Sequence, residues 1–419
     1  MEKFKDVLKH NMRQYAMLVA LVVIMLVFQI LTKGVLLKPI NVSRLIMQQC
    51  YILILAIGMV FCILSGGHID LAVGSIVALV SASSGLFSVT LGIPPLVSIL
   101  IGLGLGLLAG AWQGYFIAFV RVPPFIVTLA GQLIFRGINN MILKGKTILL
   151  PQLYITIGSG VIPDFFDIGL KLHVTTVIIG VVSAVIYFTV QLINRRRKMK
   201  LDFEVEPNRI FFIKNIVISV FIILFAYWLA RANGIPYVVI LLIVLILVYT
   251  FITNKTVAGR HVYALGGNPK AAELSGIKTK KVLFWIYANM GLLSAIAGIV
   301  FAGRLNSATP TAGSGFELDA IAACFIGGAS ASGGVGTVTG AIIGGFIMGI
   351  MNNGMSIMGV ETFWQDIVKG LVLTGAVAFD VFSKSKAKDI RVVLPRSVAR
   401  PFPNYQIRGS NLRRKVLSV

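Results

Sequence analysis

The segment IPYVVILLIVLILVYTFITNKTVAGRHVYALGGNPKAAELSGIKTKK (residues 235–281) joins a long apolar run to a short basic loop. Residues 235–253 carry no charged side chain, and about 20 mostly apolar residues suffice for an α-helix to cross a bilayer. Residues 254–281 then contain six Lys and Arg residues. Basic side chains gather in short cytoplasmic loops beside spanning helices. The segment therefore predicts a membrane-crossing helix followed by a cytoplasmic loop.

The composition of the whole chain agrees with a membrane location. Of its 419 residues, 57% are hydrophobic and 13% are charged, whereas a soluble domain carries about 25% charged residues. The 43 Gly residues suit close contact between helices in lipid, where small residues let two backbones approach. A soluble globular protein is therefore excluded.

Apolar runs of spanning length recur along the chain. We expect an all-α integral membrane protein, a polytopic bundle of about 12 (10–12) transmembrane helices with Gly-broken or re-entrant segments. The predicted spans are 15–36, 44–64, 69–91, 96–120, 124–142, 174–193, 210–230, 235–253, 282–303, 316–333, 336–357 and 364–382.

The positive charges are concentrated between these spans. Of 38 Lys and Arg residues, 27 fall in the segments 1–13, 195–214, 255–281 and 384–415. With the N-terminus inside, the predicted spans place all four segments in the cytoplasm, which favours the positive-inside pattern over nucleic-acid binding. We expect three parts, which are a cytoplasmic N-terminus (1–14), a transmembrane domain (15–383) and a basic cytoplasmic tail (384–419).

Two Gly-rich stretches interrupt the apolar pattern at similar places. They are SGGHID (65–70) and GGASASGGVG (327–336). Matching interruptions indicate a weak internal repeat with a binding site at its interface, where freed backbone lines a cavity. The alternative is a tight turn at the membrane edge. For Asp70, capping of the following helix is the alternative to substrate contact. The candidate pathway residues here are Ser65, Gly66, Gly67, Asp70 and Ser75.

A polar stripe follows one face of the span 124–142. Thr128, Gln132, Arg136 and Asn140 are each four residues apart, so they form a line about 18 Å long on a helix. Because polar side chains avoid lipid, the stripe faces protein or water. Hydroxyl, amide and guanidinium groups could pair with a sugar or polyol. The alternative is a structural role between helices.

Two further sets of charged residues are expected to be structural. Glu317 and Asp319 lie at the start of the span 316–333. Asp366 and Lys369 are three residues apart on the last span and should pair with each other.

The basic loop of residues 258–281, which we expect to be a cytoplasmic coupling loop, contains signals for a short helix. Asn268 can cap it, Pro269 suits its first position, and Gly276 ends it. A helix over 269–275 is too short to be stable alone. We therefore expect it to dock on another protein rather than to be a solvated connector. The expected coupling residues are Arg260, Gly266, Gly267, Asn268, Ala271, Ala272, Glu273 and Gly276.

Motifs for catalysis and cofactor binding are absent from the sequence. It has no Walker A sequence, no H-E-x-x-H and no catalytic dyad. Cys50, Cys62 and Cys324 lie in apolar runs and are expected to be buried. We expect no enzyme activity, cofactor or metal, and any ATP that drives transport must be hydrolysed by a separate subunit.

Several long runs resemble one family of transporters, namely the permease subunits of bacterial ABC importers for pentoses and related sugars. Within it, the chain looks most like xylose and multiple-sugar permeases. The resembling runs are IDLAVGS (69–75), VPPFIVTLAG (122–131), ALGGNPKAAELSGI (264–277), ELDAIAAC (317–324), IGGASASGGVGTVTGA (326–341) and NNGMSIM (352–358).

The resemblance implies an alternating-access permease in the bacterial inner membrane. It implies a second permease copy, an ABC ATPase that receives the short helix, and a periplasmic or lipid-anchored sugar-binding protein. Three alternatives are an ion-coupled secondary transporter, a permease of the same fold for nucleosides or branched-chain amino acids, and a membrane scaffold without transport.

Overall fold

A computed structural model of the chain describes residues 12–166, 172–201, 203, 205 and 207–393. Its contacts divide the chain into a unit of residues 1–377 and a second unit of residues 378–419. Most of the predicted N-terminal segment (1–14) and most of the predicted basic tail (384–419) lie outside the described residues. The helices and strands are α2 (Met12–Leu31), α3 (Pro39–Leu64), α4 (Val73–Gly85), η1 (Leu86–Thr90), α5 (Pro95–Tyr115), η2 (Phe116–Val120), α6 (Pro124–Leu143), β1 (Ile148–Leu149), α7 (Gln152–Ser159), α8 (Val174–Lys200), α9 (Asn208–Ala230), α10 (Tyr237–Lys255), α11 (Val257–Gly267), α12 (Pro269–Leu274), α13 (Thr279–Leu305), β2 (Ser307–Ala308), α14 (Phe316–Ile326), α15 (Val338–Ile357) and α16 (Thr362–Val393).

Proline marks the start of several helices. Pro39, Pro95 and Pro124 occupy the first helical position of α3, α5 and α6. Proline suits this position because its missing N–H would have no partner there and its φ is already helical. The sequence therefore sets where these helices begin.

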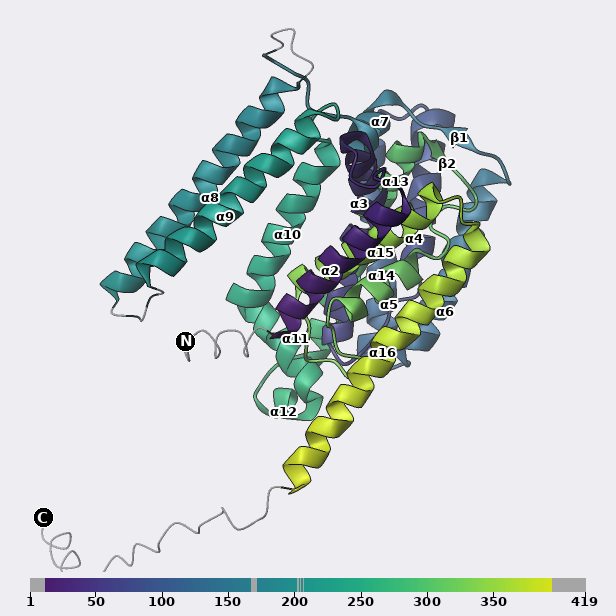
Figure 1. The fold of residues 1–419 in the computed structure, drawn as a ribbon. Coiled ribbons are helices and arrows are strands. Elements are labelled where there is room, and N and C mark those ends of the chain that lie inside the picture. The colour runs from purple at the N-terminus through teal and green to yellow at the C-terminus, as the bar shows by residue number, and fades with distance from the viewer. Residues whose placement is uncertain (1–11, 167–171, 202, 204, 206, 394–419) are drawn as a thin grey trace, which may run out of the picture. The chain divides into compact units, whose positions relative to one another are not determined.

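The unit of residues 1–377 has two distinct ends (Figure 1). At one end, β1 pairs antiparallel with β2, with Ile148 opposite Ala308, and α7 lies nearby. We call this the β-ribbon end. Helices α11 and α12 lie at the opposite end, which we call the α12 end.

Helix α3 forms the centre of the core. Every residue from Gln49 to Leu64 is buried, and α3 packs against α10, α13, α14 and α15. Small residues bring other helices close together. A Cβ atom on Gly110 of α5 or Gly291 of α13 would overlap the backbone of the facing helix. Backbone-to-backbone packing of this kind is typical of helices in lipid.

Nine of the described helices are long and apolar enough to cross a membrane. They are α3, α4 with η1, α5 with η2, α6, α8, α9, α10, α13 and α15. Helix α2 has a shorter apolar stretch, Met17–Leu31, and α16 carries Asp366 and Lys369 near its start. Neither is among the nine candidate spans of the described residues, so the structure does not show the predicted count of about 12 (10–12) spanning helices.

The predicted spanning helix at 316–333 is wrong. Helix α14 has 11 residues and ends at Ile326, which gives a length of about 16 Å, half of a hydrocarbon core of about 30 Å. Gly327 and Gly328 follow, and Gly328 has a positive φ of 79°. The Gly-rich run therefore ends the helix instead of extending it.

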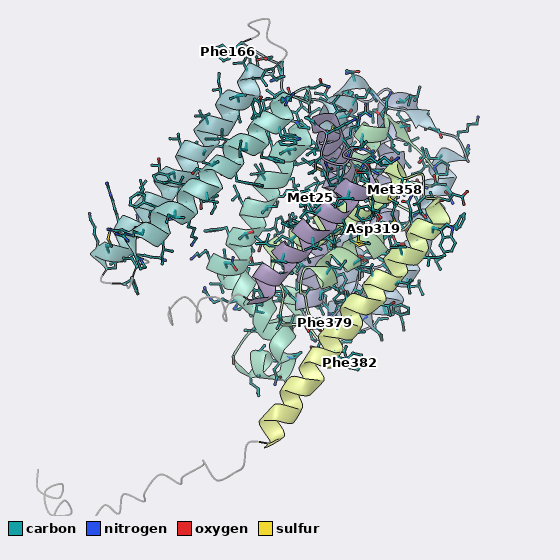
Figure 2. The ribbon with its side chains drawn as sticks, in the orientation of Figure 1. Met25, Phe166, Asp319, Met358, Phe379 and Phe382 are labelled. Carbon is teal, nitrogen blue, oxygen red and sulfur yellow. The ribbon has the colours of Figure 1, made fainter. Side chains whose placement is uncertain are left out.

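Helices α8 and α9 form a hairpin with little cover from the other helices. Gly180 of α8 faces Ala226 of α9, and apolar side chains project from both helices (Figure 2). Asp164 organises the loop before α8, because its carboxylate accepts hydrogen bonds from the hydroxyl and N–H groups of Thr175 and from the N–H of Val174. These hydrogen bonds, first of all the one from the Thr175 hydroxyl, hold the pKa of Asp164 well below its usual range.

A matched pair of Gly substitutions tests the packing of α5 on α13. Gly291→Ala should destabilise the detergent-solubilised protein by about 1–3 kcal/mol, because its Cβ meets the backbone oxygen of Gly106. Gly104→Ala should be neutral or stabilising, since nothing lies within 4 Å of a Cβ there and Ala favours a helix by about 1 kcal/mol over Gly. Thermal unfolding followed by circular dichroism measures both. Equal midpoints for the two variants would contradict this packing.

Candidate functional site

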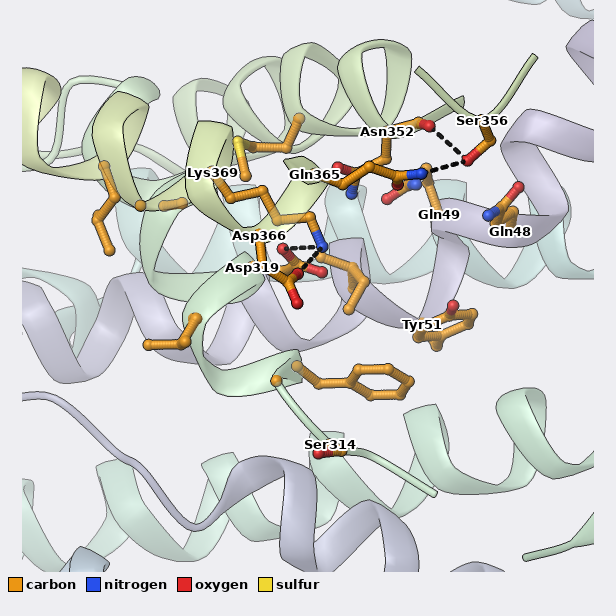
Figure 3. A pocket seen from close by; sticks show the side chains of 18 residues that line it. Gln48, Gln49, Tyr51, Ser314, Asp319, Asn352, Ser356, Gln365, Asp366 and Lys369 are labelled. Carbon is orange, nitrogen blue, oxygen red and sulfur yellow. Dashed lines mark hydrogen bonds and ion pairs between the residues drawn. The ribbon is translucent and has the colours of Figure 1, made fainter. Parts of the chain in front are cut away.

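A polar cavity lies between α3, α14, α15 and α16. It has a volume of about 480 Å³ (Figure 3). Ligand pockets span about 300–1,000 Å³, so this cavity is large enough for a small molecule. The polar and charged residues that line it are Gln48, Gln49, Tyr51, Ser314, Asp319, Asn352, Ser356, Gln365, Asp366 and Lys369.

One face of α3 connects this cavity to the β-ribbon end. Asn41, Arg44, Gln48 and Tyr51 are spaced by three, four and three residues, which places them on one side of a helix. A second hollow of about 350 Å³ is lined by Asn41, Arg44, Gln48, Ser159, Arg304 and Asn353. Gln48 lines both hollows. This polar face was not predicted, although the spacing of its residues is visible in the sequence.

An ion pair closes one wall of the cavity. The Nζ atom of Lys369 on α16 lies 3.5 Å from Oδ1 of Asp319 on α14 and 3.7 Å from Oδ1 of Asp366 (Figure 3). The predicted pairing of Asp366 with Lys369 is confirmed. The contact with Asp319 was not predicted, because it depends on the tertiary position of α14.

Aromatic rings form another part of the wall. The rings of Tyr51 and Phe316 stack with their centroids 4.8 Å apart, and Phe301 packs edge-on against Tyr51 at 5.1 Å. Tyr51 and Phe316 both line the cavity. Offset or edge-to-face pairs of this kind hold their rings rigidly.

Amide groups in the cavity retain hydrogen-bonding capacity. Asn352 is buried, and its Oδ1 atom has no hydrogen-bond partner among the described residues. Gln49 is also buried. Buried polar groups are normally paired, but the Asn352 oxygen is unpaired among the described residues and enclosed by protein. Gln48 and Gln365 are partly exposed and present their amide groups to the cavity.

The pathway candidates of the first Gly-rich break lie in tightly packed surroundings. Ser65, Asp70 and Ser75 are each at most 1% exposed. The Ser65 hydroxyl donates to the backbone oxygen of Cys62 at 2.8 Å. Oδ1 of Asp70 accepts from the N–H of Ala72 at 2.9 Å, which orders the turn before α4. None of these residues lines the two hollows described above.

The polar stripe on α6 contacts the segment that precedes α14. Nε2 of Gln132 donates to Oε1 of Glu317 at 3.3 Å. The Arg136 guanidinium donates to the backbone oxygens of Ala312 and Pro310. In a helix, these carbonyl oxygens would accept hydrogen bonds from backbone N–H groups. Here the Arg136 side chain donates to them instead.

The two ends of the stripe differ from its middle. The buried Thr128 hydroxyl bonds to the Phe125 carbonyl within its own helix, whereas Asn140 is exposed. Within the stripe, the structure therefore brings Gln132 to Glu317 at the start of α14 and Arg136 to the segment before α14.

Three Gly-containing segments meet at the α12 end. We call this contact the glycine junction, formed by 64–67, 266 and 333–336. The N–H of Gly334 donates to the oxygen of Leu64 at 3.0 Å. A Cβ atom on Gly266 of α11 would overlap that same oxygen.

The two Gly-rich breaks also touch each other in this junction. A Cβ atom on Gly67 would overlap the oxygen of Ala331, and one on Gly333 would press on Gly66. Gly67 and Gly333 have φ values of 74° and 79°, which residues with side chains rarely adopt. The hydroxyl of Tyr263 on α11 adds a hydrogen bond of 2.7 Å to the oxygen of Gly336.

The predicted short helix is confirmed as α12 (Pro269–Leu274). Oδ1 of Asn268 accepts from the N–H of Ala271 at 3.0 Å and caps it. Among the coupling candidates on α12, Ala272 is buried, whereas Ala271 and Glu273 are exposed. The adjacent Leu274 is 87% exposed.

Some other predicted coupling residues also lie at the surface. Arg260, Gly267 and Gly276 are exposed. This face of α11 and α12 presents both charged and apolar groups to solvent, which suits a protein partner.

The described part of the chain contains neither a disulfide nor a cluster of possible metal ligands. Cys50, Cys62 and Cys324 are free and buried, as predicted. Within the described part of the chain, no group of three His, Cys, Asp or Glu residues could hold a metal ion.

Comparison with known proteins places this chain in a family. Residues 41–377 match the family model described as "Branched-chain amino acid transport system / permease component". The chain belongs to this family of permease components. It is a multi-pass membrane protein of transport systems, and the predicted family resemblance is confirmed.

The individual proteins that are similar to this chain include xylose and ribose permeases. The xylose transport system permease protein XylH of Haemophilus influenzae is 42% identical over 387 residues, covering 92% of this chain and all of the relative. XylH of Escherichia coli K12 is 41% identical, with 90% and 94% covered. The ribose import permease protein RbsC of Bacillus subtilis is 35% identical, with 82% and 85% covered. No solved structure matches the chain.

Two adjacent Gly residues allow a test of the glycine junction. Gly266→Ala should reduce substrate uptake by roughly tenfold, because its Cβ would overlap the oxygen of Leu64 and overpacking of this kind costs about 1–3 kcal/mol. Gly267→Ala should leave uptake near the wild-type rate, since nothing lies within 4 Å of a Cβ there. Uptake into cells, normalised to the amount of protein in the membrane, measures both variants. Equal uptake by the two variants would contradict a tight junction.

Proposed function

We propose that the chain is the permease subunit of an ATP-driven ABC importer that carries xylose or a related monosaccharide across a bacterial inner membrane. The family match and the full-length similarity to XylH proteins support this. The single observation that carries the proposal is α12, a capped and solvent-exposed helix at one end of a membrane bundle. It is the part of the chain suited to receive force from a separate ATPase.

The α12 end faces the cytoplasm in this proposal. Residues 254–281 are basic, and so are the end of α8 (195–200) and the start of α9 (208–214). These helix ends lie on the same side of the unit as α12 (Figure 1). The positive-inside rule therefore orients the bundle with the β-ribbon end outside. Both termini are then cytoplasmic.

The proposed topology has twelve crossings, one of them only partly helical. Residues 307–308 pair with β1 at the β-ribbon end, and Gly334 bonds to Leu64 at the α12 end. The chain between them therefore passes from one end to the other, first without regular structure and then as α14. Carbonyl groups freed in the irregular half pair with Arg136 and Asn139 of α6, as lipid-embedded backbone requires.

The two Gly-rich breaks are proposed as the cores of a weak repeat. Each break follows a helix that arrives at the α12 end, α3 or α14, and precedes a helix that leaves it, α4 or α15. Because both breaks meet in the glycine junction with α11, movement of the α11–α12 segment is transmitted to both. The junction is the inner gate, and it opens when the partner ATPase moves α12.

The complete importer in this proposal contains further subunits. A second permease copy, two ABC ATPase subunits and a sugar-binding protein on the outer face complete it, within membrane lipid. The alternative of an ion-coupled transporter leaves the exposed α12 without a partner, and the alternative of a scaffold predicts no transport.

Reconstitution tests the function directly. The permease should be purified with the ATPase and the sugar-binding protein encoded in its own genome, and inserted into liposomes. We expect uptake of labelled D-xylose that requires ATP and all three components, with no uptake of labelled L-leucine. Uptake that persists without ATP and follows an ion gradient would overturn the proposal.

A surface substitution tests the role of α12. Leu274→Ser should lower ATP-driven uptake about tenfold, since removing an exposed apolar anchor from an interface costs about 1–2 kcal/mol, while membrane insertion stays normal. Leu201→Ser is the control, because Leu201 is also highly exposed (69%) and lies in the loop between α8 and α9. ATPase binding in pull-downs and sugar uptake are both measured. Full uptake by Leu274→Ser would count against docking through α12.

A further inference from the structure

We infer that the cavity between α3, α14, α15 and α16 is a sugar-binding site within the permease, and that the adjacent hollow is its entrance from the outer face. This inference rests on the proposed function and assigns a place to its substrate. It differs from the sequence-based expectation, which placed the path along the first Gly-rich break and the α6 stripe.

The polar lining matches the hydrogen-bonding needs of a sugar. Sugar hydroxyls act both as donors and as acceptors, and side-chain amides offer both functions. Gln48, Gln49, Asn352 and Gln365 supply four amides to the cavity. Of these, Gln48 and Gln365 are partly exposed, so their amide groups are accessible to the hydroxyls of a sugar.

The aromatic wall matches the apolar face of a sugar ring. The C–H groups of a pyranose present a flat apolar surface that packs well on an aromatic ring. The Tyr51 ring lies in the cavity wall and is held by Phe316 and Phe301. A fixed ring between amide groups sets the plane in which a sugar can lie.

The charges in the cavity favour a neutral ligand over an amino acid. Lys369 is already engaged by Asp319 and Asp366. The carboxylate of a zwitterionic ligand would have to compete with Asp319 and Asp366 for Lys369, the one basic side chain among the residues that line the cavity. A neutral sugar can instead share hydrogen bonds with the existing ion pair.

An access route supports the assignment of the entrance. Arg44 and Arg304 line the adjacent hollow, which also contains Asn41 and Asn353. Nδ2 of Asn41 donates to Oδ1 of Asn353 at 2.8 Å and links α3 to α15 beside this hollow. A solute that enters here meets Gln48, which also lines the larger cavity.

Protection of an introduced thiol tests the site. Ser356 lines the cavity and is exposed, whereas the three native Cys residues are buried. In right-side-out membrane vesicles, Ser356→Cys should react with a membrane-impermeant maleimide. D-xylose should slow this reaction about tenfold at ten times its dissociation constant, because occupancy follows mass action. L-leucine at the same concentration should not slow it.

Matched variants separate binding from general effects. Gln152→Cys, on the exposed surface of α7, should react with maleimide without protection by xylose. In the Ser356→Cys background, Gln49→Met should shift the xylose dependence of protection at least about tenfold, which corresponds to about 1.4 kcal/mol. Gln152→Met in that background should leave it unchanged.

The outcomes distinguish this inference from the proposed function. If reconstituted wild-type protein imports xylose but xylose does not protect Ser356→Cys, the site is wrong and the function stands. A thiol that does not react from outside excludes the entrance. Protection by leucine instead of xylose overturns the sugar assignment.

Discussion

The pairing of backbone groups where helices are interrupted is the constraint on which this structure depends. Lipid offers no hydrogen-bond partner, so each N–H and C=O freed by a break has to be satisfied within the protein. The oxygen of Leu64, at the end of α3, accepts from Gly334, and the oxygen of Gly336 accepts from Tyr263. Such contacts require close approach of backbones, which explains the Gly residues at 67, 266, 333 and 334. The same constraint applies before α14, where Arg136 serves the carbonyls of a non-helical segment.

The arrangement of α3 and α14 connects the cavity to the glycine junction. Helix α3 carries Gln48, Gln49 and Tyr51 in the cavity wall and ends at Leu64 in the junction. Helix α14 carries Asp319 in the same wall and leads into the second Gly-rich break. Because protein interiors are close-packed, a displacement at one end of a buried helix is transmitted along it. In the proposed mechanism, α11 acts on both helices at once, so that sugar binding and the inner gate are mechanically coupled.

Much of this organisation could be predicted from the sequence, because it follows from local patterns. Proline marks the first residue of several helices, and Asn268 with Pro269 marks the start of α12. Gly327 and Gly328 indicate the end of α14. The apolar residues before them favoured a longer, spanning helix in the prediction. The pairing of Asp319 with Lys369 and the overlap of Gly266 with Leu64 could not be predicted, since residues far apart in sequence meet there only after folding. The polar face of α3 could have been predicted from the spacing of Asn41, Arg44, Gln48 and Tyr51. The stripe on α6 is a stronger signal of the same kind, so the predicted pathway included α6 instead.

Hydrogen exchange in the assembled importer tests the central claim most directly, namely that the glycine junction links the coupling helices to both Gly-rich breaks. The exchange of the backbone N–H groups in residues 65–72, 257–267 and 327–337 should be measured by mass spectrometry, with and without a non-hydrolysable ATP analogue. The account predicts that nucleotide changes the exchange of all three segments together, because they share one packed contact. A change confined to residues 257–267, with both breaks unaffected, would contradict it.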